Sequence, residues 1–201
     1  MTPLIAIAAA YLIGGIPFGY LLVRMKTGRD VRALGSGNIG ATNVWRSTGR
    51  AIGVATLLLD ILKGFCAVWF AAWLTAHDVN WMSAAAIAVI LGHAFPAMLG
   101  FQGGKAVASF VGAFLYLAPL PLLATTIFFI VTVAVSRYIS LGSVLGAALF
   151  PFAVYLIQHP PAPVLLASLA GGAFIIWRHK ANIARLRAGN ENVFRLTGAK
   201  A

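Results

Sequence analysis

Three clusters of glycine, polar and basic residues in this chain are candidates for binding an anion. The first is the run GSGNIGATNVWR that begins at Gly35. Its glycines free the backbone for tight turns, and the helix expected from about Gly40 to Arg50 would offer free N–H groups and a favourable dipole to an anion. Thr42, Arg46 and Arg50 recur at every fourth position and would share one helix face. Arg46 could therefore bind phosphate oxygens with its forked guanidinium.

The second cluster, FQGGK at 101–105, repeats this arrangement in a shorter form. Gly103 and Gly104 would let the backbone approach a ligand closely, and Lys105 would supply a positive charge. The loop is not a Walker A motif, which requires G-x-x-x-x-G-K-[ST]. His93 precedes this loop and is either a buried hydrogen-bonding residue or a base.

The third cluster is WRHKANIARLRAGNE at 177–191. One interpretation is an interfacial helix whose cations contact lipid headgroups. The other is a third part of a site, because His179 and Asn182 are spaced to share a helix face. Glu191 is one of only four acidic residues in the chain.

The composition indicates that these clusters belong to a membrane protein. Of 201 residues, 61% are apolar and 9% are charged, whereas soluble domains have roughly 45–50% and 25%. The net charge of +11 suits either nucleic acid or an anionic membrane surface. The mean hydropathy of +0.91 favours the membrane, so we expect no nucleic-acid partner. Asp60 and Lys63, three residues apart in an apolar segment, are expected to form an ion pair.

Seven apolar runs are predicted to span the membrane. They lie at about 3–23, 52–75, 82–100, 107–118, 122–135, 139–158 and 162–177. The division at Pro119 and Pro121 keeps Arg137 and the basic tail on the same side as the other basic loops, as the positive-inside rule requires. The expected fold is an all-α polytopic membrane protein with seven transmembrane helices, two of them short. Residues 1–201 would form a single transmembrane domain, with the N-terminus outside and the C-terminus cytoplasmic.

The order of the motifs GSGNIGATNVWR, LDILKG, GHAFPAMLGFQGGKAVAS and HKANIARLRAGNE resembles the bacterial acyl-phosphate:glycerol-3-phosphate acyltransferase family. The resemblance covers nearly the whole chain; Ser109 stands where Thr was expected. It implies transfer of a fatty acyl group from acyl phosphate to the sn-1 hydroxyl of glycerol 3-phosphate. The products would be lysophosphatidic acid and inorganic phosphate, in the first acylation step of phospholipid biosynthesis.

The resemblance also implies a location and partners. The enzyme would be a multi-pass protein of the bacterial cytoplasmic (inner) membrane, with its active site on the cytoplasmic side. Its partners would be acyl phosphate, glycerol 3-phosphate, membrane lipids and an upstream enzyme that produces acyl phosphate. We expect neither a cofactor nor a metal. None of the four His has Asp five residues later, so the His-x-x-x-x-Asp motif of acyltransferases that use CoA or carrier-protein donors is missing, which favours acyl phosphate.

The expected site combines residues of all three clusters. The expected catalytic residues are Ser36, Asn38, Arg46, Lys105 and His93. The expected substrate-binding residues are Gly37, Thr42, Asn43, Gly103, Gly104, His179, Asn182 and Glu191. Arg46 would hold the phosphate of glycerol 3-phosphate, and the Gly-Gly-Lys loop that of the donor.

Three routes for activating the hydroxyl remain open: His93 as a base, Ser36 as a nucleophile that becomes acylated, or the phosphate of the donor as the proton acceptor. We favour direct transfer in a ternary complex. The alternative function is a membrane transporter of a small organic phosphate. A transporter would be expected to place polar residues at the bilayer midplane and to show inverted repeats, whereas the polar clusters here lie on one face and no repeat is visible.

Overall fold

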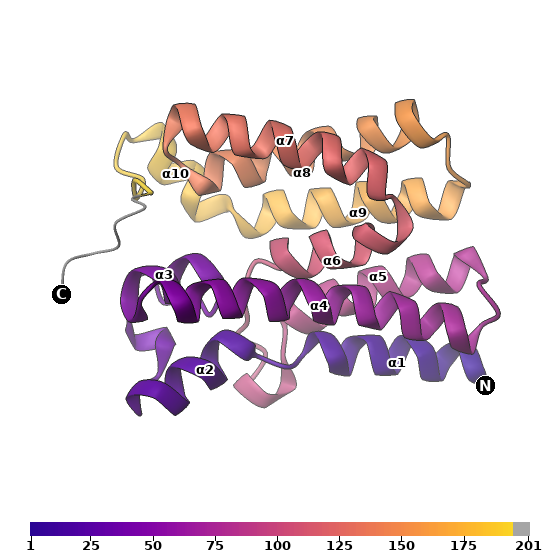
Figure 1. The fold of residues 1–201 in the computed structure, drawn as a ribbon, viewed down its shortest axis with the longest axis horizontal. Coiled ribbons are helices and arrows are strands. Elements are labelled where there is room, and N and C mark those ends of the chain that lie inside the picture. The colour runs from indigo at the N-terminus through magenta and orange to yellow at the C-terminus, as the bar shows by residue number, and fades with distance from the viewer. Residues whose placement is uncertain (195–201) are drawn as a thin grey trace.

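The computed structural model describes residues 1–194, and its regular elements are helices (Figure 1). Arg195 and Lys200 of the basic tail lie outside the described residues. The elements are α1 (Thr2–Gly14), α2 (Phe18–Thr27), η1 (Val31–Ala33), α3 (Ala41–Thr48), α4 (Arg50–Leu74), α5 (Val79–Ala94), η2 (Ala97–Leu99), α6 (Val107–Leu117), α7 (Pro119–Ser136), α8 (Ile139–Ala153), η3 (Val154–Gln158), α9 (Ala162–Arg178) and α10 (Lys180–Arg187).

The long helices form two layers with α6 between them. The first layer contains α1, α4 and α5, and the second contains α7, α8 and α9 (Figure 1). The helix α6 packs mainly on α4, while α5 contacts α9 and so joins the layers directly. Each layer presents one apolar face to the other, so the core lies between the layers around α6.

The first predicted span is interrupted, which the continuous apolar run at 3–23 did not indicate. α1 ends at Gly14 and α2 begins at Phe18, because Pro17 lacks the N–H that a continuous helix needs. The Lys63 ammonium donates a hydrogen bond to the carbonyl of Ile16 at 2.8 Å. A charged group from α4 thus satisfies a carbonyl that the break leaves without a helical partner.

Small residues let α1 and α5 approach closely. A Cβ at Gly14 would collide with the backbone of Val89, and a Cβ at Gly92 would collide with the carbonyl of Tyr11. Such contacts between small residues are typical of helix pairs in membranes, where dispersion replaces the hydrophobic effect as the source of packing energy. The pairing of α1 with α5 fixes the end of α5, from which the second cluster departs.

The predicted hairpin at 107–135 is present, but its turn is not where the prolines are. The reversal occurs at Ala118, and Pro119 and Pro121 lie in the first turn of α7, where a missing N–H has no cost. As a result α7 has 18 residues, and of the two helices of this hairpin only α6, with 11 residues, is short. The prediction of two short helices was wrong for the second one.

All seven predicted apolar runs are helical over most of their length. Within residues 1–194, five helical segments are long and apolar enough to cross a membrane, and α9 with α10, bent by 56°, would make a sixth. The helix α6 is too short to cross a 30 Å hydrocarbon core alone.

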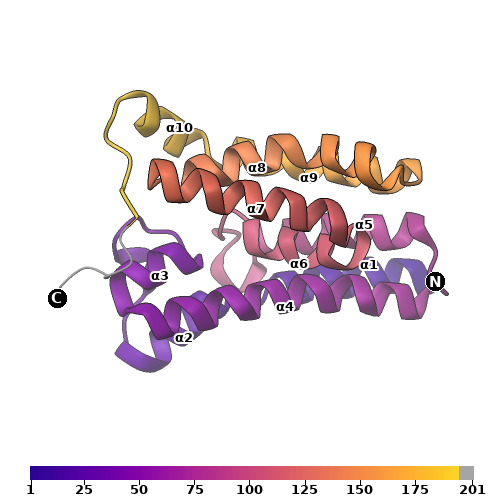
Figure 2. The same ribbon diagram turned by 45° about the horizontal axis from the view of Figure 1, so that its top comes forward.

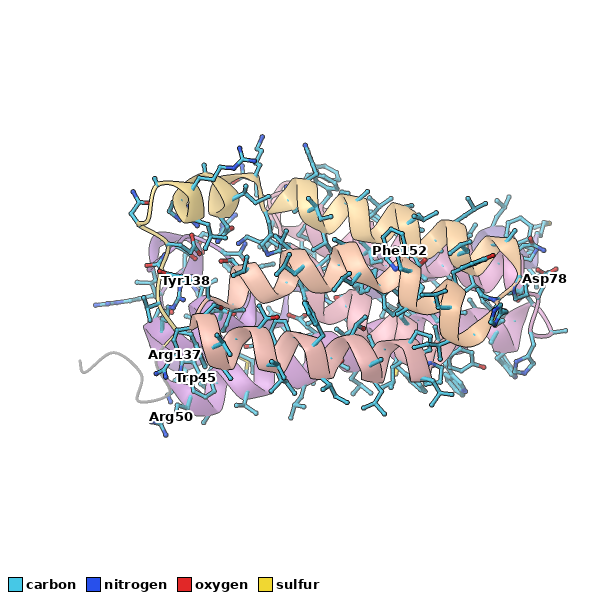
Figure 3. The ribbon with its side chains drawn as sticks, turned by 90° about the horizontal axis from the view of Figure 1, so that it is seen from above. Trp45, Arg50, Asp78, Arg137, Tyr138 and Phe152 are labelled. Atoms are coloured by element: carbon cyan, nitrogen blue, oxygen red, sulfur yellow. The ribbon has the colours of Figure 1, made fainter. Side chains whose placement is uncertain are left out.

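The connections divide between two ends of the molecule. We call the end that carries α3, α10, Arg50 and Arg137 the basic end, and Asp78 lies at the opposite end (Figure 3). The α4–α5 and α8–α9 connections, which contain no Lys or Arg, also lie at the opposite end, near the N-terminus (Figure 1). The basic and basic-free connections are therefore separated as the charge pattern predicted.

Candidate active site

A cavity of about 600 Å³ lies between the layers and brings the three sequence clusters together. Its polar part is lined by Ser36, Asn38, Thr42, Asn43, Arg46, His93, Lys105, Arg178, His179, Asn182, Arg185 and Glu191. Its remaining walls are mainly apolar residues of α4, α6, α7 and α8, and we call this part the apolar groove. The polar residues on these walls are Asp60, Thr125, Thr126, Ser140 and Ser143. Residues far apart in the chain thus form one site with a polar part and an apolar part.

Asn43 gives the first cluster its shape. Its side chain is buried, and its Oδ1 accepts a hydrogen bond from the Ser36 N–H at 2.8 Å. Its Nδ2 donates to the carbonyls of Asn38 at 2.8 Å and Leu34 at 3.0 Å. A Cβ at Gly35, where φ is +54°, would collide with this amide. The Asn43 amide thus holds the segment that carries Ser36 and Asn38, while its contact with substrate stays a prediction.

The loop before α3 has fewer free N–H groups than the sequence indicated. The N–H groups of Ser36, Gly37 and Gly40 all donate to acceptors of the loop or of the Asn43 side chain. The helix also ends at Thr48, two residues earlier than expected, because the chain turns at Gly49 with φ +107°. Arg50 consequently starts α4, is exposed, and does not share a helix face with Thr42 and Arg46. Of these three residues, Thr42 and Arg46 line the cavity, and Arg46 supplies the positive charge.

The residues at 190–194, which we call the closing segment, connect the end of α10 to α3 at the basic end (Figure 2). The Arg46 guanidinium donates to the carbonyl of Asn192 at 3.2 Å, and the rings of Trp45 and Phe194 lie 5.8 Å apart. Burial lowers the pKa of Arg46, although the negative charge of Glu191 acts in the opposite direction. The closing segment thus forms one wall of the polar part of the cavity.

The second cluster folds back on the end of α5. The N–H groups of Gly103 and Gly104 donate to two carbonyls of α5, each at 3.1 Å, and a Cβ at Gly104 would collide with the ring of His93. Arg178 donates to the carbonyls of Gly104 at 2.9 Å and of Gly103 at 3.2 Å. Both glycines therefore approach protein groups and are not among the cavity-lining residues, contrary to the expectation of a ligand-binding backbone. Their role is to place Lys105 at the wall.

Lys105 is held by the third cluster. Its ammonium donates to the side-chain oxygen of Asn182, whose Nδ2 donates to Glu191 at 2.7 Å. Glu191 also accepts hydrogen bonds from Ser140 at 3.0 Å and from Arg185 at 2.7 Å. Asn182 and Glu191 thus lie at the site as predicted, and each spends its hydrogen bonds on neighbouring protein groups.

The environment of Lys105 and of Glu191, which lie outside the membrane-spanning helices, lowers the pKa of both side chains. Burial lowers the pKa of Lys105 to about 8, with Glu191 opposing and the nearby arginines adding to the decrease. Burial alone would raise the pKa of Glu191. The hydrogen bonds that it accepts from Asn182, Arg185 and Ser140 lower the pKa by a larger amount, so the net pKa lies below the usual value. Glu191 is therefore charged at neutral pH, while Lys105 begins to lose its proton slightly above it.

His93 is buried, and it belongs to a cluster of buried polar residues with Asp60, Lys63 and Ser109. Its Nδ1 lies 3.2 Å from the Ser109 hydroxyl and 3.7 Å from Asp60 Oδ1, and the Lys63 ammonium lies 2.8 Å from the same Asp60 oxygen. The predicted Asp60–Lys63 pair is confirmed. Because Nδ1 faces Ser109 and Asp60 while Nε2 abuts Gly104, the ring supports the second cluster from below. This placement favours a positioning role for His93 over a role as the base.

The remaining predicted residues fall into two groups. Ser36, Asn38, Thr42 and His179 line the cavity, while Gly37, with φ +72°, shapes the loop behind it. The Nδ1 of His179 donates to the carbonyl of Ile175 at 2.8 Å. In the neutral ring, Nε2 is then a hydrogen-bond acceptor.

Among the cavity residues that were not predicted, Ser140, Arg178 and Arg185 hydrogen-bond to predicted residues of the site. Arg178 directly precedes His179 in the third cluster, which was a usable signal for Arg178. Arg185 stood among other cations of an amphipathic run, and Ser140 had no distinguishing sequence context.

The comparisons with known proteins agree with one another. The sequence pattern of the family described as "Glycerol-3-phosphate acyltransferase" matches residues 4–189. The glycerol-3-phosphate acyltransferase of Geobacter sulfurreducens is 47% identical over 195 residues, covering 97% of this chain and 99% of the relative. That of Desulforamulus reducens is 45% identical over 191 residues, covering 95% and 94%.

The fold is also similar to that of a solved relative. The crystal structure of PlsY (YgiH), an integral membrane glycerol 3-phosphate acyltransferase, in its glycerol 3-phosphate form, superimposes with a TM-score of 0.92 at 35% identity. The match covers 98% of each chain. The lysophosphatidic acid form of the same enzyme gives a TM-score of 0.89 at 34% identity, covering 98% of this chain and 97% of that one.

Proposed function

This chain belongs to the glycerol-3-phosphate acyltransferase family, and from that premise we propose that its acyl donor is acyl phosphate and its product lysophosphatidic acid. It is an integral membrane acyltransferase of the PlsY type, so the transporter alternative is set aside. The acceptor is the sn-1 hydroxyl of glycerol 3-phosphate, and the second product is inorganic phosphate.

The observation that carries this proposal is the joining of a cationic polar part to an apolar groove in one cavity. In the described part of the chain, Arg46, Lys105 and Arg178 donate hydrogen bonds to uncharged oxygen atoms. Their charges are therefore available to an anion, and three cations suit a reaction in which both substrates carry phosphate. The apolar groove suits the acyl chain of one of them.

We assign the two phosphates to the two sides of the polar part. Arg46, on α3, binds the phosphate of glycerol 3-phosphate. Lys105 binds the donor phosphate, with Arg178 adjacent. Ser36 and Asn38, on the loop held by Asn43, line the same cavity and orient the reacting groups by hydrogen bonds. The catalytic contribution is positioning and stabilisation of charge, because acyl phosphate already has a good leaving group.

The acyl transfer is direct in this proposal. The sn-1 hydroxyl oxygen bonds to the acyl carbon, and the bond from that carbon to the phosphate oxygen breaks, with its electron pair leaving on phosphate. The hydroxyl proton passes to the departing phosphate, whose oxygen gains basicity as that bond breaks. The placement of His93 supports this route, since its ring nitrogens face Ser109, Asp60 and Gly104.

The membrane arrangement follows from the distribution of charge. The basic end faces the cytoplasm, and the N-terminus lies on the outer side of the bacterial inner membrane, with seven helices in the bilayer. Glycerol 3-phosphate then enters from the cytoplasm at the polar part. Acyl phosphate must be supplied by an enzyme that forms it, because nothing in the proposed reaction makes it.

The test is product formation by detergent-purified protein given glycerol 3-phosphate and palmitoyl phosphate, with palmitoyl-CoA in a parallel reaction. We expect lysophosphatidic acid and inorganic phosphate from palmitoyl phosphate alone. Product from the CoA ester would show that the assigned donor is wrong. Failure of both donors with folded protein would overturn the proposed reaction.

A further inference from the structure

The apolar groove has a measurable depth along two helices. On α8 its lining runs from Ser140, bonded to Glu191, to Phe150, ten residues further on. On α7 it runs from Val133 to Leu122, eleven residues apart. At 1.5 Å per residue these distances are about 15 Å and about 16–17 Å. The groove therefore has a similar length on both of these walls.

Three aromatic rings close the deep end of the groove. Phe110 and Phe150 line it, and Phe114 packs behind them, with ring centroids 4.5 to 5.1 Å apart. All three side chains are buried. Phe110 is seated against Gly171 of α9, where a Cβ would lie 2.9 Å from the ring. The floor is thus supported from the second layer and is held in one position.

Two glycines of α8, Gly142 and Gly146, face the groove. At only one of them does a neighbouring side chain fill the volume that a Cβ would occupy. A Cβ at Gly142 would lie 2.8 Å from the ring of Phe129, so that ring occupies its place. A Cβ at Gly146 would have no neighbour within 4 Å, although Gly146 lines the cavity. Gly146 therefore leaves open space in the groove wall, between Ser143 and Phe150.

We propose that Gly146 and the Phe110–Phe114–Phe150 floor set how much of the acyl chain is recognised; this inference rests on the proposed function. An extended chain of single bonds advances roughly 1.2 Å per bond, so a groove of about 15 Å accommodates about a dozen bonds. Each methylene group within that length contributes burial. Carbons beyond that length are not buried in the groove. They extend toward the lipid between α4 and α7 and contribute little binding energy.

The resulting prediction concerns how kcat/KM depends on chain length. In the wild type, kcat/KM rises by up to about fourfold for each added methylene group that is buried, until the chain reaches about a dozen carbons. It then levels off. Gly146→Leu fills the open space about 9 Å from Ser140. The variant should level off near eight carbons, with octanoyl phosphate nearly unaffected and palmitoyl phosphate at least tenfold poorer relative to it.

Phe150→Ala should have the opposite effect, since removal of the ring lengthens the groove. Longer donors should gain relative to lauroyl phosphate by up to about fourfold for each methylene group newly buried. The matched control is Phe152→Ala, on the same helix, because Phe152 is 65% exposed on the outer surface (Figure 3). It should leave all ratios unchanged.

The experiment measures kcat/KM for octanoyl, lauroyl and palmitoyl phosphate in one detergent, for the wild type and the three variants. A shift of the ratios in opposite directions for Gly146→Leu and Phe150→Ala supports the inference. If Phe150→Ala does not fold, the shift of Gly146→Leu toward octanoyl phosphate decides alone. Equal loss with all donors, or unchanged ratios, overturns the role of Gly146 and the floor. A wild type inactive with every acyl phosphate overturns the proposed function and this inference with it.

Discussion

Replacement of Asn43 by alanine tests whether this residue holds the loop or binds substrate. The substitution removes the acceptor for the Ser36 N–H and the donor to the carbonyls of Asn38 and Leu34. All three backbone groups lose a partner at once. Ser36 and Asn38 would then be free to leave the positions that the proposed reaction requires.

The size of the effect follows from the contacts. A lost hydrogen bond costs about 0.5–1.5 kcal/mol, and more where a buried group is left without a partner. Ser36 and Asn38 line the cavity, so water can reach part of the loop, and we expect a total loss of about 2–4 kcal/mol in the free energy of unfolding. A displacement of Ser36 by about 1 Å would lower kcat/KM about 100-fold.

The assay combines kinetics for both substrates with thermal unfolding in detergent. Asn43→Ala should lower kcat with either substrate varied and should also lower the unfolding midpoint. Ser47→Ala is the matched control, because Ser47 lies one turn further along α3 and its hydroxyl contacts the Asn43 carbonyl and the Thr48 hydroxyl, not the loop. A variant with normal kcat, a normal midpoint and a raised KM for glycerol 3-phosphate alone would show that Asn43 is a direct ligand.

Three further predictions concern other residues of the polar part. Ser36→Ala should slow transfer, and intact-mass measurement should find no acyl group on the wild type; an adduct that the substitution abolishes would refute direct transfer. Lys105 is charged below its pKa of about 8, so kcat/KM should fall above that pH as phosphate loses its cation. Lys105→Arg should flatten this limb, and an unchanged limb would assign the titration to another group. Glu191→Gln should lower the free energy of unfolding by about 1–2 kcal/mol, since the ion pair with Arg185 is partly solvent-exposed. Because the native pKa of Glu191 lies below its ordinary value of 4.5, this contribution is complete above 4.5 and is lost as the pH falls further. The wild type and the variant should therefore converge in acid, and a constant difference would contradict the assignment.

The apolar helices were predicted well because each corresponds to a long run of apolar residues in the sequence. The prediction failed where a single residue redirects the backbone. Pro17 interrupts a run that is apolar on both sides, and Gly49 ends α3 before Arg50. Pro119 and Pro121 were placed in a turn, although proline is equally at home in the first turn of a helix.

The site was predicted in its membership and less well in its division of labour. The polar residues of the three clusters do meet around one cavity. Sequence does not show which of them face the ligand and which face each other, because Asn43 and Ser36 have equally polar side chains. The groups that Gly104 contacts lie on α5 and α9, and only the packing of these helices shows that its neighbours are His93 and Arg178.

The closing segment also constrains how the protein is made. Arg46 and Asn192 are 146 positions apart, and Glu191 accepts hydrogen bonds from Ser140 of α8 and from Asn182 and Arg185 of α10. A ribosome therefore delivers α1–α6 to the membrane well before the residues that complete their polar end. Until residues 182–192 have been made, Arg46 and Lys105 lack their hydrogen-bond partners Asn192 and Asn182, so the nascent chain cannot catalyse the reaction. For expression, it follows that a tag should not replace any residue of the closing segment.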